Sequence, residues 1–463
     1  MSRRGVAVVA GAFALCALIV ALAPAREGLT VQGQRVLAVV VLAVGLWITD
    51  AMAPGVTALL VITALAVSGG APSLGAALSG FSEPIAYFLV GVLTLGLAVS
   101  RSGLADRLAR WSLARSAGRP RRLYAQMLAS FPLLTLVLPS ATTRTAIMVH
   151  VYDQALSLSA VPTGSPLAKA IMLALNSVNR LASTVILTGG ITPAVAAGLI
   201  GGFSWTRWFV LMSVPYAALL AVAAATIYLR HGRGFGDELT LPPARDRSPL
   251  SAVELRTLLI ALGASALWLT DAWHHWHPAI PAMLAWICLL APGIGVLRWA
   301  DFERELGWAN LFVLAGSLSL AQAMMRSGAG AWLAAAVLRA VPGLAADPLL
   351  LVVALLVSAA VMRLVIPNIT GFLALTIPVA MSLGAGAGLN PVLCGLVVMI
   401  AGDAVLYYPA QSASSLVVYE RGHLTAPEIF AFGLWMTAIA FAVVLGVALP
   451  YWSLVGEPLV PVR

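Results

Sequence analysis

The stretch Leu46-Trp47-Ile48-Thr49-Asp50-Ala51 returns almost unchanged as Leu267-Trp268-Leu269-Thr270-Asp271-Ala272. Each copy closes an apolar segment, and the copies lie 221 positions apart in a chain of 463 residues. This spacing indicates that the chain consists of two duplicated units. Duplication is typical of secondary transporters, in which the working site lies where the two copies meet. The two aspartates of the hexapeptide stand at helix ends, so we expect helix caps or scaffold contacts there.

Two further blocks repeat in the same order downstream. The segment from Leu89-x-Gly91-x-Leu93 to Arg101-Ser102-Gly103 is matched by that from Leu314-x-Gly316-x-Leu318 to Arg326-Ser327-Gly328, at an offset of 225. Then Pro139-Ser140-Ala141-Thr142 is matched by Pro367-Asn368-Ile369-Thr370, at an offset of 228. Three blocks in one order at nearly one offset exclude chance similarity.

The composition is that of a membrane protein. Hydrophobic residues make up 61% of the chain and charged residues 10%, whereas soluble domains carry about 25% charged residues. The net charge of +9 comes almost wholly from arginines in short loops between apolar stretches. That distribution is typical of cytoplasmic loops and not of a nucleic-acid-binding surface. The pattern predicts an all-α polytopic membrane protein with the lipid bilayer as its partner.

Loop charge also orients the two copies. Residues 101–122 contain seven arginines and one acid, whereas the corresponding residues 326–347 contain two arginines and one acid. The first segment is therefore expected on the cytoplasmic side and the second on the extracytoplasmic side. Corresponding parts of the repeat face opposite sides, which predicts an inverted-topology repeat.

These observations give a layout with about eleven transmembrane helices and two re-entrant helical hairpins. The expected segments are an N-terminal transmembrane helix over 1–30, a first repeat over 31–229, a cytoplasmic linker over 230–253 and a second repeat over 254–455. The hairpins are expected near 123–158 and 348–387, and the broken spans near 167–200 and 391–418. The chain is predicted to lie in the plasma membrane with its N-terminus cytoplasmic and its C-terminus extracytoplasmic.

Polar side chains gather in the middle of each expected hairpin, beside Pro139 and Pro367. Irregular backbone at membrane depth is tolerated only where it lines a cavity or is buried in protein. The helix after each tip presents free N–H groups and a positive dipole end, which favour an anion. We expect the two tips together to bind an anion with two acidic groups; the alternative is that these side chains only cap helices. They are Ser140, Thr142, Thr143 and Thr145 in the first tip and Asn368 and Thr370 in the second.

Three arginines lie in or beside the expected hairpins and broken spans: Arg144, Arg180 and Arg363. A mid-membrane arginine costs about 2.5–3.5 kcal/mol on insertion scales, so it normally faces a partner or a wet cavity. We expect one or more of them to bind the anion directly, and the alternative is pairing with local acids or carbonyls. Asp403, in the second broken span, is a candidate ion partner of Arg180, a candidate proton-coupling group, or a residue at the membrane interface.

Over residues 35–455 the chain resembles the divalent anion:sodium symporter family, which carries di- and tricarboxylates and sulfate. The resemblance rests on the Gly-x-Leu-x-Leu segments, on the stretch Trp308-Ala309-Asn310-Leu311-Phe312-Val313-Leu314-Ala315-Gly316, and on the two tips. It implies eleven spans, two re-entrant hairpins, inverted repeats and a homodimer. The family's Ser-Asn-Thr signature contacts substrate carboxylates and sodium, and it corresponds to Ser140-Ala141-Thr142 and Asn368-Ile369-Thr370.

This chain departs from the family pattern at the central tip position. Ala141 and Ile369 replace the family's asparagine and offer no side-chain oxygen to a hard cation. Of the second pair of motifs, Thr192-Pro193 remains in the first half and Ser412 lies in the corresponding stretch of the second half. The resemblance therefore implies at most weak sodium sites, at Ser140, Thr142, Asn368 and Thr370, and no other cofactor.

The function predicted from these features is secondary transport of small divalent anions, either di- or tricarboxylates or sulfate, by alternating access, with or without coupling to a cation. The alternative is a sodium-independent anion exchanger or a proton-coupled carrier in which arginines replace the sodium sites. A membrane-embedded enzyme is disfavoured because the in-membrane acids are few and scattered, and no Walker motif or nucleophile–base arrangement is present. A sensor on a transporter scaffold would bind the anion without flux.

Overall fold

A computed structural model describes residues 28–461 except Asp50, Pro139, 237–238 and 241–248, together with residues 11, 14 and 16. Every regular element among these residues is a helix, which confirms the predicted fold class. The N-terminal helix expected over 1–30 lies almost wholly outside the described residues, as do the proline of the first tip, the aspartate of the first hexapeptide and much of the linker.

Within the described residues, seven helices are long and apolar enough to cross a membrane, or eight if the bent pair α16 (Trp299–Glu305) and α17 (Ala309–Arg326) forms one span. Their outer faces carry large exposed apolar side chains such as Leu259, Leu349 and Trp435, as expected for contact with lipid. The total of about eleven spans stays a prediction. The seven are α2 (Val31–Thr49), α5 (Pro84–Arg101), α12 (Trp205–His231), α13 (Ala252–Leu269), α20 (Pro348–Val365), α21 (Ile369–Gly386) and α24 (Ala426–Val443).

Each stretch expected as a hairpin contains two helices of 18 residues with a short break between them. In the first stretch α7 (Pro120–Val137) precedes α8 (Ala141–Leu158), and in the second α20 precedes α21. The breaks coincide with the polar tip motifs. The repeat boundaries, the inverted topology and the re-entrant character of the hairpins stay predictions.

The two stretches expected as broken spans are both interrupted. In the first, α9 (Pro166–Leu173) continues through a π-helical turn, Ala174–Val178, into α10 (Asn179–Thr184), and α11 (Ile191–Ile200) follows after a break. In the second, α22 (Pro391–Asp403) is followed by a break and α23 (Ala413–Tyr419). Interruptions of this kind free backbone groups for other partners, and π-helical turns occur frequently at functional sites.

The glycines of the repeated Gly-x-Leu-x-Leu block mark close crossings of helices. A Cβ atom on Gly91 of α5 would lie 2.5 Å from the carbonyl oxygen of Ala282 in α15 (Ala279–Leu290). A Cβ atom on Gly316 of α17 would lie 2.9 Å from the Cβ atom of Ala58 in α3 (Pro54–Ser68). Small residues let membrane helices approach closely, so the duplicated glycine serves the same packing role in both copies.

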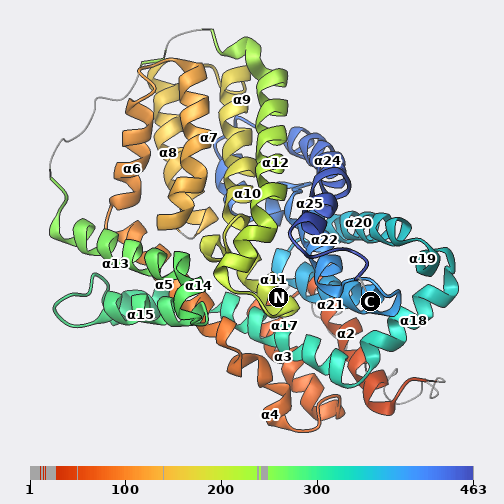
Figure 1. The fold of residues 1–463 in the computed structure, drawn as a ribbon. Helices are drawn as coiled ribbons and strands as arrows, with labels where there is room; N and C mark the ends of the chain where they lie inside the picture. Colours follow the sequence, from red (N-terminus) through yellow and green to blue (C-terminus); the bar gives the residue numbers. More distant parts are fainter. Residues whose placement is uncertain are drawn as a thin grey trace.

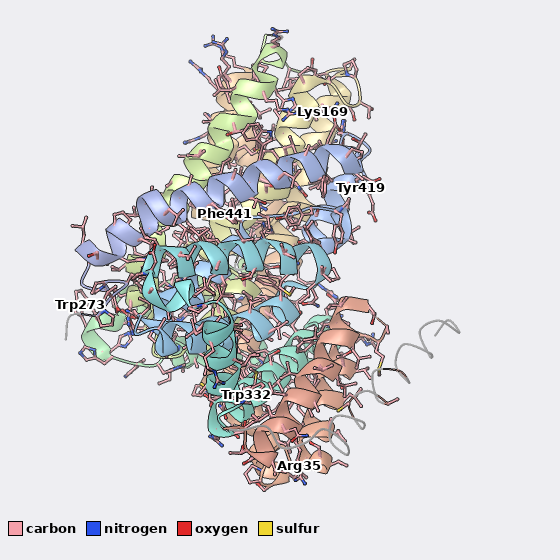
Figure 2. The ribbon with its side chains drawn as sticks, turned by 90° about the vertical axis from the view of Figure 1, so that its right-hand side faces the viewer. Arg35, Lys169, Trp273, Trp332, Tyr419 and Phe441 are labelled. Atoms are coloured by element: carbon pink, nitrogen blue, oxygen red, sulfur yellow. The ribbon has the colours of Figure 1, made fainter. Side chains whose placement is uncertain are left out.

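The helices divide into an upright bundle and a set of crossing helices. Helices α6 (Leu104–Ala114), α7, α8, α9 and α12 run side by side in the upper part of Figure 1, with α13 and α15 crossing below them. Figure 2 shows Lys169 of α9 and Arg35 of α2 at opposite ends of the molecule. The tips and the breaks in the spans line one cavity.

The duplicated hexapeptide makes a packing contact in the first copy and a helix cap in the second. The Trp47 ring packs so closely on Gly371 that a Cβ atom there would lie 3.1 Å from it. In the second copy, Asp271 accepts hydrogen bonds from the backbone N–H of Thr206, at 3.0 Å, and from its hydroxyl. Asp271 therefore caps the start of α12, which confirms the scaffold role expected for this aspartate.

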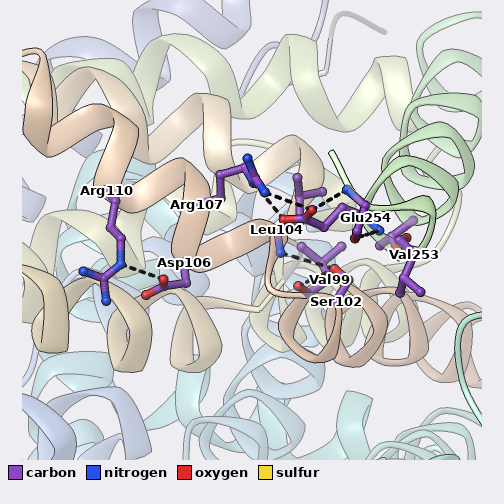
Figure 3. Close-up of polar contacts among 10 residues, drawn as sticks. Val99, Ser102, Leu104, Asp106, Arg107, Arg110, Val253 and Glu254 are labelled. Atoms are coloured by element: carbon purple, nitrogen blue, oxygen red, sulfur yellow. Dashed lines mark hydrogen bonds and ion pairs between the residues drawn. The ribbon is translucent and has the colours of Figure 1, made fainter. Parts of the chain in front are cut away.

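A bidentate ion pair joins α6 to the start of α13 (Figure 3). The Nε atom of Arg107 lies 2.7 Å from one carboxylate oxygen of Glu254, and its Nη2 atom lies 3.1 Å from the other. Glu254 also accepts from the backbone N–H of Ser251, in a capping box that begins α13. One carboxylate thus fixes a helix start and a contact between two helices.

Candidate functional site

The tips and the broken spans together enclose a cavity of about 390 Å³. Eleven of the thirteen residues predicted to bind the substrate line this cavity, and the other two, Thr143 and Arg144, do not. Their binding roles stay predictions. The eleven are Ser140, Ala141, Thr142, Arg180, Thr192, Pro193, Arg363, Asn368, Ile369, Thr370 and Ser412.

The first tip is closed by a serine cap. Ser140 has an extended backbone, and its hydroxyl accepts the backbone N–H of Thr143 at 3.3 Å and the Thr143 hydroxyl at 2.9 Å. Such a cap satisfies one of the free N–H groups at the start of α8. Thr142 is exposed to the cavity. Thr143 therefore supports the cap, whereas Thr142 presents its side chain to a ligand.

The second tip is closed by an asparagine cap. The Oδ1 atom of Asn368 accepts the backbone N–H groups of Thr370 at 2.9 Å and Gly371 at 3.2 Å. The side-chain oxygen of Asn368 is therefore used by the start of α21, and its amide nitrogen remains for a ligand. Ser140 and Asn368 thus cap helices and also line the cavity, and the binding of an anion by the tips stays a prediction.

The ion pair expected between the two broken spans is present. The Nη1 atom of Arg180 lies 2.8 Å from the Oδ1 atom of Asp403, which confirms this pairing. The Oδ2 atom of Asp403 accepts the hydroxyls of Thr184 at 2.8 Å and Tyr216 at 2.9 Å. The Nε and Nη2 atoms of Arg180 are buried and have no partner among the described residues. Arg180 thus lines the cavity with unused donor capacity.

Arg144 lies behind the first tip and does not line the cavity. Its side chain is 0% exposed, and its donors bind the carbonyl of Leu138, the carbonyl and side chain of Asn179, and the hydroxyl of Ser183. This placement does not support direct anion binding by Arg144, and it matches the alternative of pairing with local carbonyls. The direction of a side chain at the first turn of α8 could not be read from the sequence.

Arg363 is held in the same way but reaches the cavity wall. Its donors bind the carbonyls of Ile366 at 2.8 Å, Pro367 at 2.5 Å and Gly402 at 3.2 Å. Gln411 joins α20 to the break in the second broken span. Its amide nitrogen donates to the backbone carbonyl of Arg363 at 2.6 Å, and its side-chain oxygen accepts the backbone N–H of Tyr407. Arg363 therefore contributes positive charge to the cavity while its own hydrogen bonds go to backbone.

The charges around the cavity do not cancel. Among the described residues that line the cavity, Arg180 and Arg363 are charged; Asp403 pairs with Arg180, and Arg144 binds the backbone just before the first tip. Arg180 and Asp403 neutralise each other, and the described residues hold no ion pair to Arg144 or Arg363. Two buried positive charges remain, and burying an uncompensated charge is costly unless a counter-ion arrives.

The residues expected to hold sodium do not fit that ion. A hard cation needs several oxygen ligands directed at one point. The Oδ1 atom of Asn368 is taken by two backbone N–H groups, and the Ser140 hydroxyl is taken by Thr143. Carbonyl oxygens before both tips face arginine donors instead. Thr142 and Thr370 alone offer too few oxygens.

Several polar residues at the cavity were not predicted. Gln411 and Asn310 line it; Asn310 lies in the stretch used to establish the resemblance, and Gln411 directly precedes the predicted Ser412. Ser183 and Thr184 follow Arg180 in the first broken span, where a polar run in an apolar segment was the available signal. Tyr216, which binds Asp403, comes from the middle of α12 and has no motif around it.

Comparison with known proteins places this chain among membrane transporters. A family model described as the sodium:sulfate symporter transmembrane region matches residues 7–457. A protein of Cupriavidus necator named only as a membrane protein is 27% identical, over 96% of this chain and 92% of its own length. A sodium-dependent dicarboxylate transporter of Staphylococcus saprophyticus is 22% identical, over 90% and 86% respectively.

Two further similarities agree with these matches. A citrate/succinate antiporter of Escherichia coli strain K12 is 23% identical, over 81% of this chain and 79% of its own length. The crystal structure of the YdaH transporter of Alcanivorax borkumensis superposes with a TM-score of 0.54 at 16% identity, covering 83% of this chain and 88% of that one. The structural similarity supports a transporter fold.

Proposed function

Because this chain belongs to the sodium:sulfate symporter family, we propose that it is a secondary transporter of small dicarboxylates and related di- or trivalent anions. One observation carries the proposal: two buried guanidiniums beside the cavity have no acidic partner among the described residues. A dianion would neutralise this charge, whereas a neutral or cationic solute would leave it uncompensated. The cavity volume of about 390 Å³ is at the lower end of the range for small-molecule sites.

The two tips suit the two ends of a dicarboxylate. Thr142 and the start of α8 line the cavity, and so do Asn368 and the start of α21. Helix N-termini favour carboxylates through their free N–H groups and dipole. Arg180 also lines the cavity, and its buried Nε and Nη2 atoms, which have no partner among the residues described, would donate to the anion once the side chain turns toward it. Each carboxylate would then meet one tip, with Arg180 between them.

We further propose that the hairpins and broken spans move as one unit against the other helices, which stay fixed. The resemblance to the family implies that this scaffold forms a homodimer and that the repeats are inverted. Alternating access would then bring the cavity to each side of the plasma membrane in turn.

The proposal is tested by transport into proteoliposomes containing the purified protein. Labelled succinate is offered outside, with citrate, tartrate, sulfate and a monocarboxylate as competitors. Saturable uptake that di- and tricarboxylates inhibit, and a monocarboxylate does not, is the expected result. Arg180→Met should abolish uptake, and Arg339→Met, which changes an exposed arginine in α18 (Ala329–Ala340), should leave it unchanged. Absence of saturable uptake of every di- or trivalent anion would refute the proposal.

Anion exchange is the second candidate, and it is favoured by the antiporter among the relatives. An exchanger returns to its starting orientation only when a substrate is bound. Uptake of labelled succinate would then require unlabelled dicarboxylate inside the vesicles. Equal uptake into empty and loaded vesicles would exclude exchange and leave uniport or ion-coupled transport.

A further inference from the structure

The first hairpin tip is fastened to its broken span by one arginine. The guanidinium of Arg144 donates to the carbonyl of Leu138 at 2.6 Å, on the tip side. On the side of α10 it donates to the Oδ1 and carbonyl oxygens of Asn179, both at 3.1 Å, and to the hydroxyl of Ser183 at 2.5 Å. Four oxygens from two separate segments thus surround one buried cation, and no carboxylate is among them.

The second tip is fastened in the same way by Arg363. Its guanidinium donates to the carbonyls of Ile366 and Pro367 on the tip side, at 2.8 and 2.5 Å. On the side of the second broken span it donates to the carbonyls of Gly402 at 3.2 Å and Gln411 at 3.4 Å. Arg363 is 1% exposed, so its bonds to the backbone are shielded from water.

The two arginines reach equivalent acceptors from different arms of their hairpins. Arg144 follows its tip in α8, whereas Arg363 precedes its tip in α20. Each nevertheless donates to the carbonyl two residues before the helix cap, Leu138 before Ser140 and Ile366 before Asn368, and to a carbonyl in the neighbouring broken span. A shared position in the sequence cannot explain this agreement. What the two sites share is a buried group of oxygens, with backbone carbonyls from the tip and from the broken span among them.

A cluster of buried carbonyl oxygens can be satisfied by a bound metal cation or by N–H donors. A guanidinium carries five donors in a rigid planar fork, so it can bind oxygens from two segments at once. Unlike a dissociable ion, it stays in place whatever the salt composition. Because the charge is covalently attached, the anion site is positively charged before any ion binds.

Building on the proposed function, we infer that Arg144 and Arg363 are tethered cations that hold each tip against its broken span and replace bound sodium. They are positioning residues, and they place the tip groups around the anion without contacting it through a free donor. The consequence is that the chain binds its dicarboxylate equally well with and without sodium.

The test measures succinate binding to the purified full-length protein in sodium chloride and in an equal concentration of choline chloride. The wild-type affinities are expected to agree within about twofold. Arg144→Met and Arg363→Met keep most of the side-chain volume but remove the charge, and each is expected to weaken binding by about tenfold or more. Arg339→Met, at an exposed position, is the control and should bind like the wild type.

Rescue separates a tethered cation from a side chain that only fills space. Methylguanidinium, at concentrations that do not unfold the wild type, should restore binding to Arg144→Ala, and Arg144→Lys should retain part of it. A strict sodium requirement of the wild type overturns the inference. Normal binding by both methionine variants overturns it, and so does loss that neither methylguanidinium nor lysine repairs. If neither succinate nor citrate binds the wild type in either salt, the proposed function fails and the inference fails with it.

If Arg144→Met and Arg144→Ala do not fold, the inference is still tested by Arg363→Met and Arg363→Ala. It is also tested by the comparison of wild-type succinate affinity in the two salts. Folding is checked by gel filtration and thermal unfolding before any affinity is compared.

Discussion

The Nη1 atom of Arg180 lies 2.8 Å from the Oδ1 atom of Asp403, and both side chains are buried where the two broken spans meet. The second oxygen of Asp403 accepts two hydroxyls, so the carboxylate has partners on both sides. This pair is neutral as a whole. The positive charge available to an anion therefore comes from Arg144 and Arg363. Because Asp403 neutralises Arg180, the net charge of the groups around the cavity is about +2.

Asp403→Asn should shift the preference of the site from dianions to trianions. The amide keeps the shape of the carboxylate and can still accept hydrogen bonds, but Arg180 is no longer neutralised. We expect the ratio of citrate to succinate affinity to rise about tenfold, or about 1.4 kcal/mol, at a pH where citrate carries three charges.

Competition binding measures this ratio. Asp347→Asn is the control, because it removes one negative charge at the start of α20 and retains a residue that caps a helix equally well. The same shift in both variants, or no shift in Asp403→Asn, would contradict the charge count.

Asn368→Asp separates capping from anion binding at the second tip. Aspartate and asparagine are equally good helix caps, so the bonds to Thr370 and Gly371 should persist and the unfolding temperature should change little. The added negative charge lies beside the expected carboxylate, and we expect succinate affinity to fall by about tenfold or more. Asn368→Ala should instead cost about 1 kcal/mol of stability through loss of the cap. Unchanged affinity in Asn368→Asp would show that the anion does not approach this tip.

The repeated blocks made the positions of the two helix breaks predictable. Proline followed by small polar residues in the middle of an apolar stretch favours a break, which is found before Ser140 and Asn368. Proline alone does not decide it, because Pro132, Pro215 and Pro378 lie inside continuous helices. The fold class followed from composition and hydropathy alone. The pairing of Arg180 with Asp403 was one of the expected alternatives, because a buried arginine in one copy and a buried acid in the other need each other.

The arrangement of donors and acceptors around the arginines could not be predicted. Arg144 and Arg363 bind backbone carbonyls, and every residue has a carbonyl, so no residue type marks the acceptors. Tyr216 reaches Asp403 from a helix that is 187 positions away and lies inside an ordinary apolar segment. The contact depends on how α12, which carries Tyr216, packs against α22, which carries Asp403.

Asp271 should make stability depend on acidity. Burial raises the pKa of this carboxyl group, but hydrogen bonds from the Thr206 hydroxyl and backbone N–H outweigh burial and hold the pKa below its usual range. A depressed pKa means that the contribution to stability is complete above the unfolded value of about 3.9 and is lost as the pH falls through the folded value. Asp271→Asn should therefore be less stable than the wild type by about 0.5 kcal/mol at neutral pH.

Thermal unfolding measured at a series of pH values tests this effect. The difference between the wild type and Asp271→Asn should shrink as the pH falls below about 4. A difference that stays constant or grows on acidification has the wrong sign and would disprove the assignment.

Arg107 and Arg110 lie on the same helix and should differ in their effect on stability. Arg107 pairs with Glu254, whose side chain is 8% exposed, whereas Arg110 pairs with Asp106, whose side chain is 46% exposed (Figure 3). Exposed pairs contribute little, so Arg110→Ala should change stability by less than about 0.5 kcal/mol. Arg107→Ala leaves a shielded carboxylate without its arginine and should cost about 1 kcal/mol or more. Equal effects of the two variants in thermal unfolding would indicate that Glu254 is solvated in solution.

The two duplicated glycines should respond differently to a methyl group. In Gly91→Ala the new Cβ atom would meet the backbone oxygen of Ala282 at 2.5 Å, so α5 and α15 must move apart. Overpacking of this kind costs about 1–3 kcal/mol. In Gly316→Ala the nearest atom is the Ala58 side chain at 2.9 Å, and a smaller loss is expected. Gly263 lies on an exposed face of α13 with nothing within 4 Å, so Gly263→Ala should raise stability by about 0.5–1 kcal/mol. Thermal unfolding that ranks Gly91→Ala at or above the wild type would show that the crossing of α5 and α15 is looser than the structure has it.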